Sequence, residues 1–137
     1  MLKHLTLAAS ALALLAAPGV HAEDTIEMTR GEAKLQKMLE GRVAGEPERC
    51  IRTISQRSFT KIDETALVYR SGDTIWVNRT RTPYAIDDSD YLVIRKFSGT
   101  TLCRTDQVTT YDRVGNFFSG VIMLDDFVPY RKAGDAG

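Results

Sequence analysis

Histidine is almost absent from this chain, which has two among its 137 residues, His4 and His21. Both lie within residues 1–22, a segment that we predict is removed on export. A Ser-His-Asp or Cys-His nucleophile then has no base, and a zinc site lacks a usual ligand. Glycine-rich phosphate loops of the Walker and Rossmann types are also absent from the sequence. These absences favour a non-catalytic protein, and the sequence identifies no catalytic residue.

Residues 1–22 have the three parts of a secretory signal peptide. Lys3 provides the positive start, residues 5–17 form an apolar run, and small residues lead up to Ala22. The run is too short to span a bilayer, so we expect no transmembrane anchor. No cysteine directly follows it, so the lipid-attachment site of a bacterial lipoprotein is missing. The sequence predicts cleavage before Glu23 and a soluble protein of the periplasm.

Cysteine is equally scarce, with Cys50 and Cys103 as the only two. Two thiols in a small exported domain usually pair, because the compartment is oxidising. A disulfide that closes a loop of about 50 residues stabilises a domain by about 4 kcal/mol in the chain-entropy description. A redox-active pair is the alternative, but the Cys-X-X-Cys spacing that lowers a thiol pKa is missing. We therefore predict a structural disulfide.

Neither sign of charge is in excess, since 18 Lys and Arg residues face 18 Asp and Glu residues. This balance provides no long-range attraction toward nucleic acid or anionic lipid. We expect no nucleic-acid partner.

A helix is predicted within the first part of the exported chain, residues 23–47. Thr29 and Glu32 have the spacing of a capping box, and Gly41 is a suitable C-terminal cap. Residues 42–47 contain Gly and Pro and are expected to be a loop. The helix should cover the core with the apolar residues on one face, which are Leu35, Met38 and Leu39.

Short β-rich runs fill residues 48–132, and residues 133–137 are expected to be a flexible tail. The clearest signal is a hairpin that turns at residues 71–73. Short connections favour an antiparallel meander that forms a curved sheet or a small, partly open barrel. The predicted fold class is mainly β (α+β), with one short N-terminal helix and one disulfide. The expected strands are residues 50–55, 57–62, 65–70, 74–79, 91–97, 100–104, 108–112 and 117–124.

Several short segments together form a joint pattern over residues 41–130. They are residues 41–47 (GRVAGEP), 50–51, 62–63, 68–70, 77–79, 102–103 and 126–130 (DFVPY). On this pattern the chain resembles an uncharacterised family of small exported proteins from proteobacteria. The resemblance implies export and paired cysteines, and it provides no catalytic residues.

Arginines and aromatic residues on the predicted strands form the candidate binding surface. Arginine forks on one face of a sheet bind phosphate or carboxylate groups, although a solvent-facing sheet carries such residues as well. Trp76 beside Tyr69 is suited to a binding platform, or alternatively to core packing. Arg95 and Arg104 lie on other predicted strands and can share a face with the arginines of the hairpin. The binding surface that the sequence predicts consists of Arg70, Trp76, Arg79 and Arg81.

The densest acidic run is Asp87, Asp88 and Asp90, in an expected loop. Clustered carboxylates suit Ca²⁺, but the spacing does not fit an EF-hand. We therefore expect a solvated turn, no metal site and no cofactor. A glycosidase-like pair of carboxylates drawn from these residues, Asp125 or Asp126 is the enzymatic alternative.

The sequence thus predicts an exported, non-catalytic domain that binds another envelope protein or a cell-wall component. Binding is expected to depend on the arginines near the hairpin of residues 65–79 and to survive metal chelation. The alternatives are a carboxylate-dependent hydrolase acting on an envelope polymer and a structural or stress-protective protein. The sequence identifies neither the ligand nor the oligomeric state.

Overall fold

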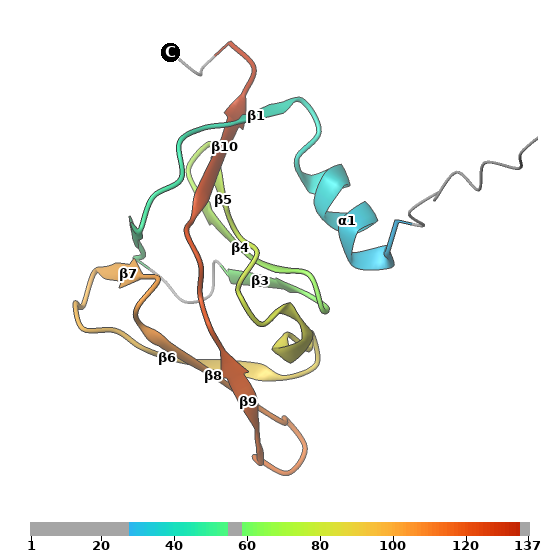
Figure 1. Cartoon of the computed structure of the whole chain (residues 1–137), viewed down its shortest axis with the longest axis vertical. Coiled ribbons are helices and arrows are strands. Elements are labelled where there is room, and N and C mark those ends of the chain that lie inside the picture. Colours follow the sequence, from blue (N-terminus) through green and yellow to red (C-terminus); the bar gives the residue numbers. More distant parts are fainter. Residues whose placement is uncertain (1–27, 55–58, 135–137) are drawn as a thin grey trace, which may run out of the picture.

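Antiparallel β-sheet dominates the structure, a computed structural model that describes residues 28–54 and 59–134 (Figure 1). The predicted signal peptide, residues 1–22, lies outside the described residues, as does most of the predicted tail. The described part contains one α-helix and ten short strands in three sheets that do not close into a barrel. The predicted mainly β fold with one helix and one disulfide is confirmed.

The helix α1 (Arg30–Met38) begins where its capping residue predicts. The Thr29 hydroxyl accepts a hydrogen bond from the backbone N–H of Glu32 at 3.1 Å, which satisfies one of the unpaired donors of the first turn. Gly41 follows the helix with φ of 72°, a conformation that glycine adopts without steric cost. Leu35 is buried, and Met38 and Leu39 pack beside it, as the apolar spacing predicts.

Five strands form the largest sheet, in the order β1-β10-β5-β4-β3. Every neighbouring pair is antiparallel. The meander that the sequence predicts applies to the three consecutive strands β3, β4 and β5. The bounds are β1 (Arg42–Ala44), β3 (Phe59–Ile62), β4 (Ala66–Ser71), β5 (Thr74–Asn78) and β10 (Val128–Lys132).

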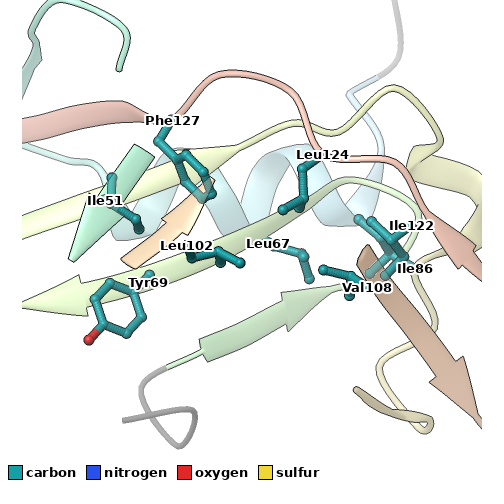
Figure 2. Close-up of a cluster of buried hydrophobic side chains, with 9 residues drawn as sticks. All are labelled: Ile51, Leu67, Tyr69, Ile86, Leu102, Val108, Ile122, Leu124 and Phe127. Carbon is teal, nitrogen blue, oxygen red and sulfur yellow. The ribbon is translucent and has the colours of Figure 1, made fainter. Parts of the chain in front are cut away.

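This sheet is buried on both faces, because alternate residues of β4 enter two different hydrophobic clusters. Ala66 and Val68 lie in the cluster beneath α1, together with Leu35. Leu67 and Tyr69 point to the opposite face and belong to the larger cluster drawn in Figure 2. The helix therefore covers one face, and the remaining strands cover the other.

Two smaller sheets form that second layer. Their orders are β2-β7 and β6-β8-β9, again with antiparallel pairs. A short 3₁₀ helix, η2 (Pro83–Ala85), lies beside β9. The strand bounds are β2 (Cys50–Arg52), β6 (Tyr91–Arg95), β7 (Thr101–Cys103), β8 (Gln107–Tyr111) and β9 (Phe118–Ile122).

Two strands, β1 and β10, were not expected from the sequence. Residues 42–44, predicted as loop, pair with β10 in the register Arg42↔Lys132. Strand β10 contains Pro129, which discourages a strand prediction because proline cannot donate a backbone hydrogen bond. Its carbonyl oxygen still accepts a hydrogen bond from the N–H of Gly45 at 2.7 Å. These strands depend on partners far away in the sequence, so short-range patterns do not reveal them.

The α-helix of the described residues is too short and too polar to cross a membrane.

Candidate functional site

Cys50 and Cys103 are bonded to each other and occupy opposite positions in the β2–β7 pair, with a Cα–Cα distance of 4.0 Å. The predicted disulfide is confirmed. Since these are the only cysteines, the chain has no free thiol to act as a nucleophile or a metal ligand.

The predicted binding surface is divided between the two faces of the large sheet. Arg70 pairs with Ile75, whose side chain lies in the cluster beneath α1. Trp76 pairs with Tyr69 on the opposite face and packs against the larger cluster. The guanidinium of Arg131 lies 5.8 Å from the centre of the Trp76 ring. The Trp76 side chain is therefore half-buried against the larger cluster, and the Arg131 guanidinium lies over its ring.

The other predicted arginines also have local partners. Arg79 forms an ion pair with Glu32 of α1. Arg81 donates from Nε to the carbonyl oxygen of Leu124 at 3.2 Å. Arg81 and Arg104 do converge on one hollow of about 290 Å³, but Arg104 is paired there with Asp126 at 3.0 Å. The structure thus brings two of the arginines that the sequence considered, Arg81 and Arg104, to one hollow.

The acidic loop meets a carboxylate that the sequence analysis did not include. Asp63, in the β3–β4 turn, joins Asp87 and Asp88, and one carboxylate oxygen of each lies within 4.8 Å of the others. Asp90 does not join them: it is buried, and its carbonyl oxygen accepts a hydrogen bond from Lys61. The trio is exposed. It supplies three of the six to eight oxygen ligands that Ca²⁺ takes.

Hydrogen bonds stabilise the ionised form of Asp87. The side chain and the backbone N–H of Ser89 both donate to its Oδ1, at 2.6 and 2.8 Å. These two contacts lower the pKa of Asp87 below its ordinary value. A carboxyl group with a lowered pKa is poorly suited to act as a general acid near neutral pH.

A different feature is the outward face of the sheet β6-β8-β9. Leu92 and Ile94 of β6 pack inward against the larger cluster, so Tyr91 and Val93 point outward. The ladder places Thr109 and Tyr111 beside them on β8, and Val121 and Phe118 beside those on β9. We call this set of outward side chains the aromatic face: Tyr91, Val93, Thr109, Tyr111, Phe118 and Val121.

Three of these residues form a continuous aromatic row across the strands. The rings of Tyr91 and Tyr111 are stacked with centroids 5.6 Å apart, and Phe118 meets Tyr111 edge-on at 5.9 Å. Cross-strand aromatic pairs of this kind stabilise a sheet. The row ends in solvent at Phe118, which is 59% exposed, and Val121 on the same face is 42% exposed. The sheet therefore presents apolar surface on its outer side as well as in the core.

The sequence analysis missed the aromatic face, although one signal for it is present. Residues 91–94 are four consecutive apolar residues, whereas a strand with one solvated face normally alternates. Phe117 and Phe118, adjacent in the sequence, also cannot both point inward from one strand. The register that aligns the rings across three strands is visible only in the structure.

Comparison of the chain with protein-family models, with curated proteins and with solved structures finds no match in any of the three.

Proposed function

We propose that this protein is an exported, non-catalytic domain that binds a component of the cell envelope through the aromatic face. One observation carries the proposal: a sheet that already buries its inner side exposes a contiguous row of apolar side chains on its outer side. Exposed apolar surface of this kind is typical of sites where proteins dock.

Export to the periplasm is part of the same proposal. The disulfide between Cys50 and Cys103 is compatible with an oxidising compartment. The signal-like residues 1–22 and the resemblance to small exported proteobacterial proteins support the same location. We include membership of that family in the proposal.

The arrangement of carboxylates favours binding over hydrolysis. A retaining or inverting hydrolase needs one carboxyl group that stays protonated near neutral pH. The pKa of Asp87 is shifted the opposite way. Asp126, a second candidate from the sequence, is engaged in an ion pair with Arg104.

Site-specific photo-crosslinking in living cells tests the proposal. A photoreactive phenylalanine analogue replaces Phe118 or Val121, and the control carries it at Lys37 on the exposed side of α1. We expect the two positions on the aromatic face to capture an envelope component and the control to capture none. Absence of capture at Phe118 and Val121, or equal capture at Lys37, contradicts the proposal.

The same assay tests the binding surface that the sequence predicts. Arg79→Ala combined with Arg81→Ala removes two of its arginines without altering the aromatic face. Capture from Phe118 is expected to persist in this double variant. Its loss would favour the arginine surface over the aromatic face.

A further inference from the structure

The β8–β9 loop is the most prominent projection beside the aromatic face. Figure 1 shows it extending beyond the sheets at one end of the long axis, at the opposite end from the pairing of β1 with β10. We call residues 112–117 the hairpin tip. Three apolar side chains at or next to the tip face solvent: Val114 is 96% exposed, Phe117 is 73% exposed and Phe118 is 59% exposed.

Hydrogen bonds hold the hairpin tip in one conformation. Oδ1 of Asp112 accepts from the backbone N–H groups of Val114 and Gly115, at 2.8 and 2.7 Å. The backbone of Asp112 also accepts from Asn116 and donates to Phe117. The hydroxyl of Tyr91 donates to the Asn116 side chain at 3.2 Å, which ties the tip to the aromatic row.

Close packing also orients Phe117. A Cβ atom at Gly115 would lie 2.3 Å from the Phe117 ring, so the ring lies directly against the glycine. The tip therefore presents the Phe117 ring in a defined arrangement, and the hydrogen bonds of the turn position the backbone of Val114. Little conformational entropy remains to be lost when these groups are buried against a partner.

The hairpin tip carries one charge of each sign, on Asp112 and Arg113. Asp112 directs an oxygen into the turn, whereas Arg113 is exposed, and the described residues include no ion pair to it. Lys61 of β3 lies near enough to Arg113 for the two positive charges to interact. Burial lowers its pKa, and the positive charge of Arg113 lowers it further, although the nearby Asp88 acts in the opposite direction.

We infer that the hairpin tip docks on a lipid bilayer that contains anionic lipid. Val114 and Phe117 enter the boundary between headgroups and acyl chains, and Arg113 contacts lipid phosphate. This inference rests on the proposed function, because it names the envelope component that the aromatic face and its tip meet.

The shape and chemistry of the tip favour a bilayer over a protein groove. The apolar side chains extend from a convex projection, which penetrates a soft surface more readily than it fits a flat one. Apolar groups beside an arginine match the two layers of a membrane interface, where acyl chains lie beneath phosphates. One basic residue next to a few apolar groups predicts weak, reversible docking, because stable anchoring requires a larger apolar group or several charges.

Vesicle sedimentation tests the inference with protein recovered from the periplasm, its N-terminus determined by mass spectrometry. The probes are phosphatidylcholine vesicles with and without phosphatidylglycerol. We expect binding to the mixed vesicles, reduced by about tenfold or more in Val114→Ser combined with Phe117→Ser, because apolar area is lost. Arg113→Gln is expected to weaken binding by about fivefold and to reduce its salt dependence.

Phe97→Ser is the matched control. Phe97 is 91% exposed, but it lies beyond the other end of β6, away from the tip. Circular dichroism and thermal unfolding establish that each variant is folded. Equal losses in Phe97→Ser and in the tip variant, or unchanged binding in the tip variant, would overturn the inference.

A second readout separates this inference from the proposed function. The photoreactive analogue at Phe117 should label lipid in the mixed vesicles and in cells. Labelling of a protein alone, with no binding to vesicles, would reject the bilayer and retain envelope binding. No labelling of any partner at Phe117, Phe118 or Val121 would reject both proposals.

Discussion

The side chain of Asn78 closes a pair of hydrogen bonds with the backbone of Asp125. Nδ2 of Asn78 donates to the Asp125 carbonyl at 2.6 Å, and its Oδ1 accepts from the Asp125 N–H at 3.0 Å. The same Oδ1 accepts from Thr80, a β-branched residue with φ of 54°. Asn78 thus ties the end of β5 to the chain between β9 and β10, and it is 1% exposed.

Asn78→Ala is expected to lower the free energy of unfolding by about 3 kcal/mol, because three backbone groups lose the hydrogen bonds that the buried Asn78 side chain makes. Urea unfolding measures the change. Gln107→Ala, at an exposed residue of β8, is the control and should change stability by less than about 0.5 kcal/mol. Similar losses of unfolding free energy in both variants would show that the Asn78 hydrogen bonds stabilise the fold no more than an exposed side chain does.

Cys50→Ser combined with Cys103→Ser should lower stability by about 2–4 kcal/mol under oxidising conditions, because the bridge restricts the unfolded chain. Thermal unfolding with and without reductant measures the effect, and reductant should not affect the variant. Non-reducing peptide mapping of the protein recovered from cells should find this one linked pair. Recovery of two alkylatable thiols would contradict it.

Ser89→Ala should raise the pKa of Asp87 toward 3.8, since Ser89 provides the largest lowering contribution. In the wild-type protein the pKa is lower when folded than when unfolded. The carboxylate therefore contributes stability above about pH 3.9, and this contribution is lost as the pH falls through the folded value. Carbon NMR of the side-chain carboxyl measures both values, with Ser98→Ala, another exposed serine, as the control. An unchanged titration in Ser89→Ala would refute this assignment.

Chelation by EDTA should not change capture from Phe118, because the aromatic face contains no carboxylate. Photo-crosslinking with and without EDTA tests this. If EDTA abolished capture and Ca²⁺ restored it, Asp63, Asp87 and Asp88 would become the leading site. Asp63→Asn combined with Asp88→Asn would then reproduce the effect of EDTA.

The mature N-terminus is expected to be Glu23, because small residues up to Ala22 match what a signal peptidase recognises. Intact mass of the periplasmic protein tests this. The mass of the uncut chain, or of a chain cut elsewhere, would contradict the prediction.

Local sequence alone determined the helix start, the β4–β5 hairpin and the cysteine pair. Thr29 and Glu32 are three residues apart, so the cap depends on neighbouring residues only. The hairpin turn has Gly72 with φ of 55°, a local requirement as well. The two cysteines had only one possible intramolecular partner each, so the expectation of export sufficed to predict the bond.

Tertiary structure decided where the candidate sites lie. Strand β10 pairs with β5 and β1, which lie far from it in the sequence. No short-range sequence pattern therefore predicts this pairing. Asp63 joins Asp87 and Asp88 because two turns distant in the sequence meet. Arg70 and Trp76 lie on opposite faces of the large sheet because alternate residues of a strand point to opposite sides. The row of Tyr91, Tyr111 and Phe118 depends on the register of three strands. Register is determined by burial of the inner face, a long-range property that residue spacing does not encode.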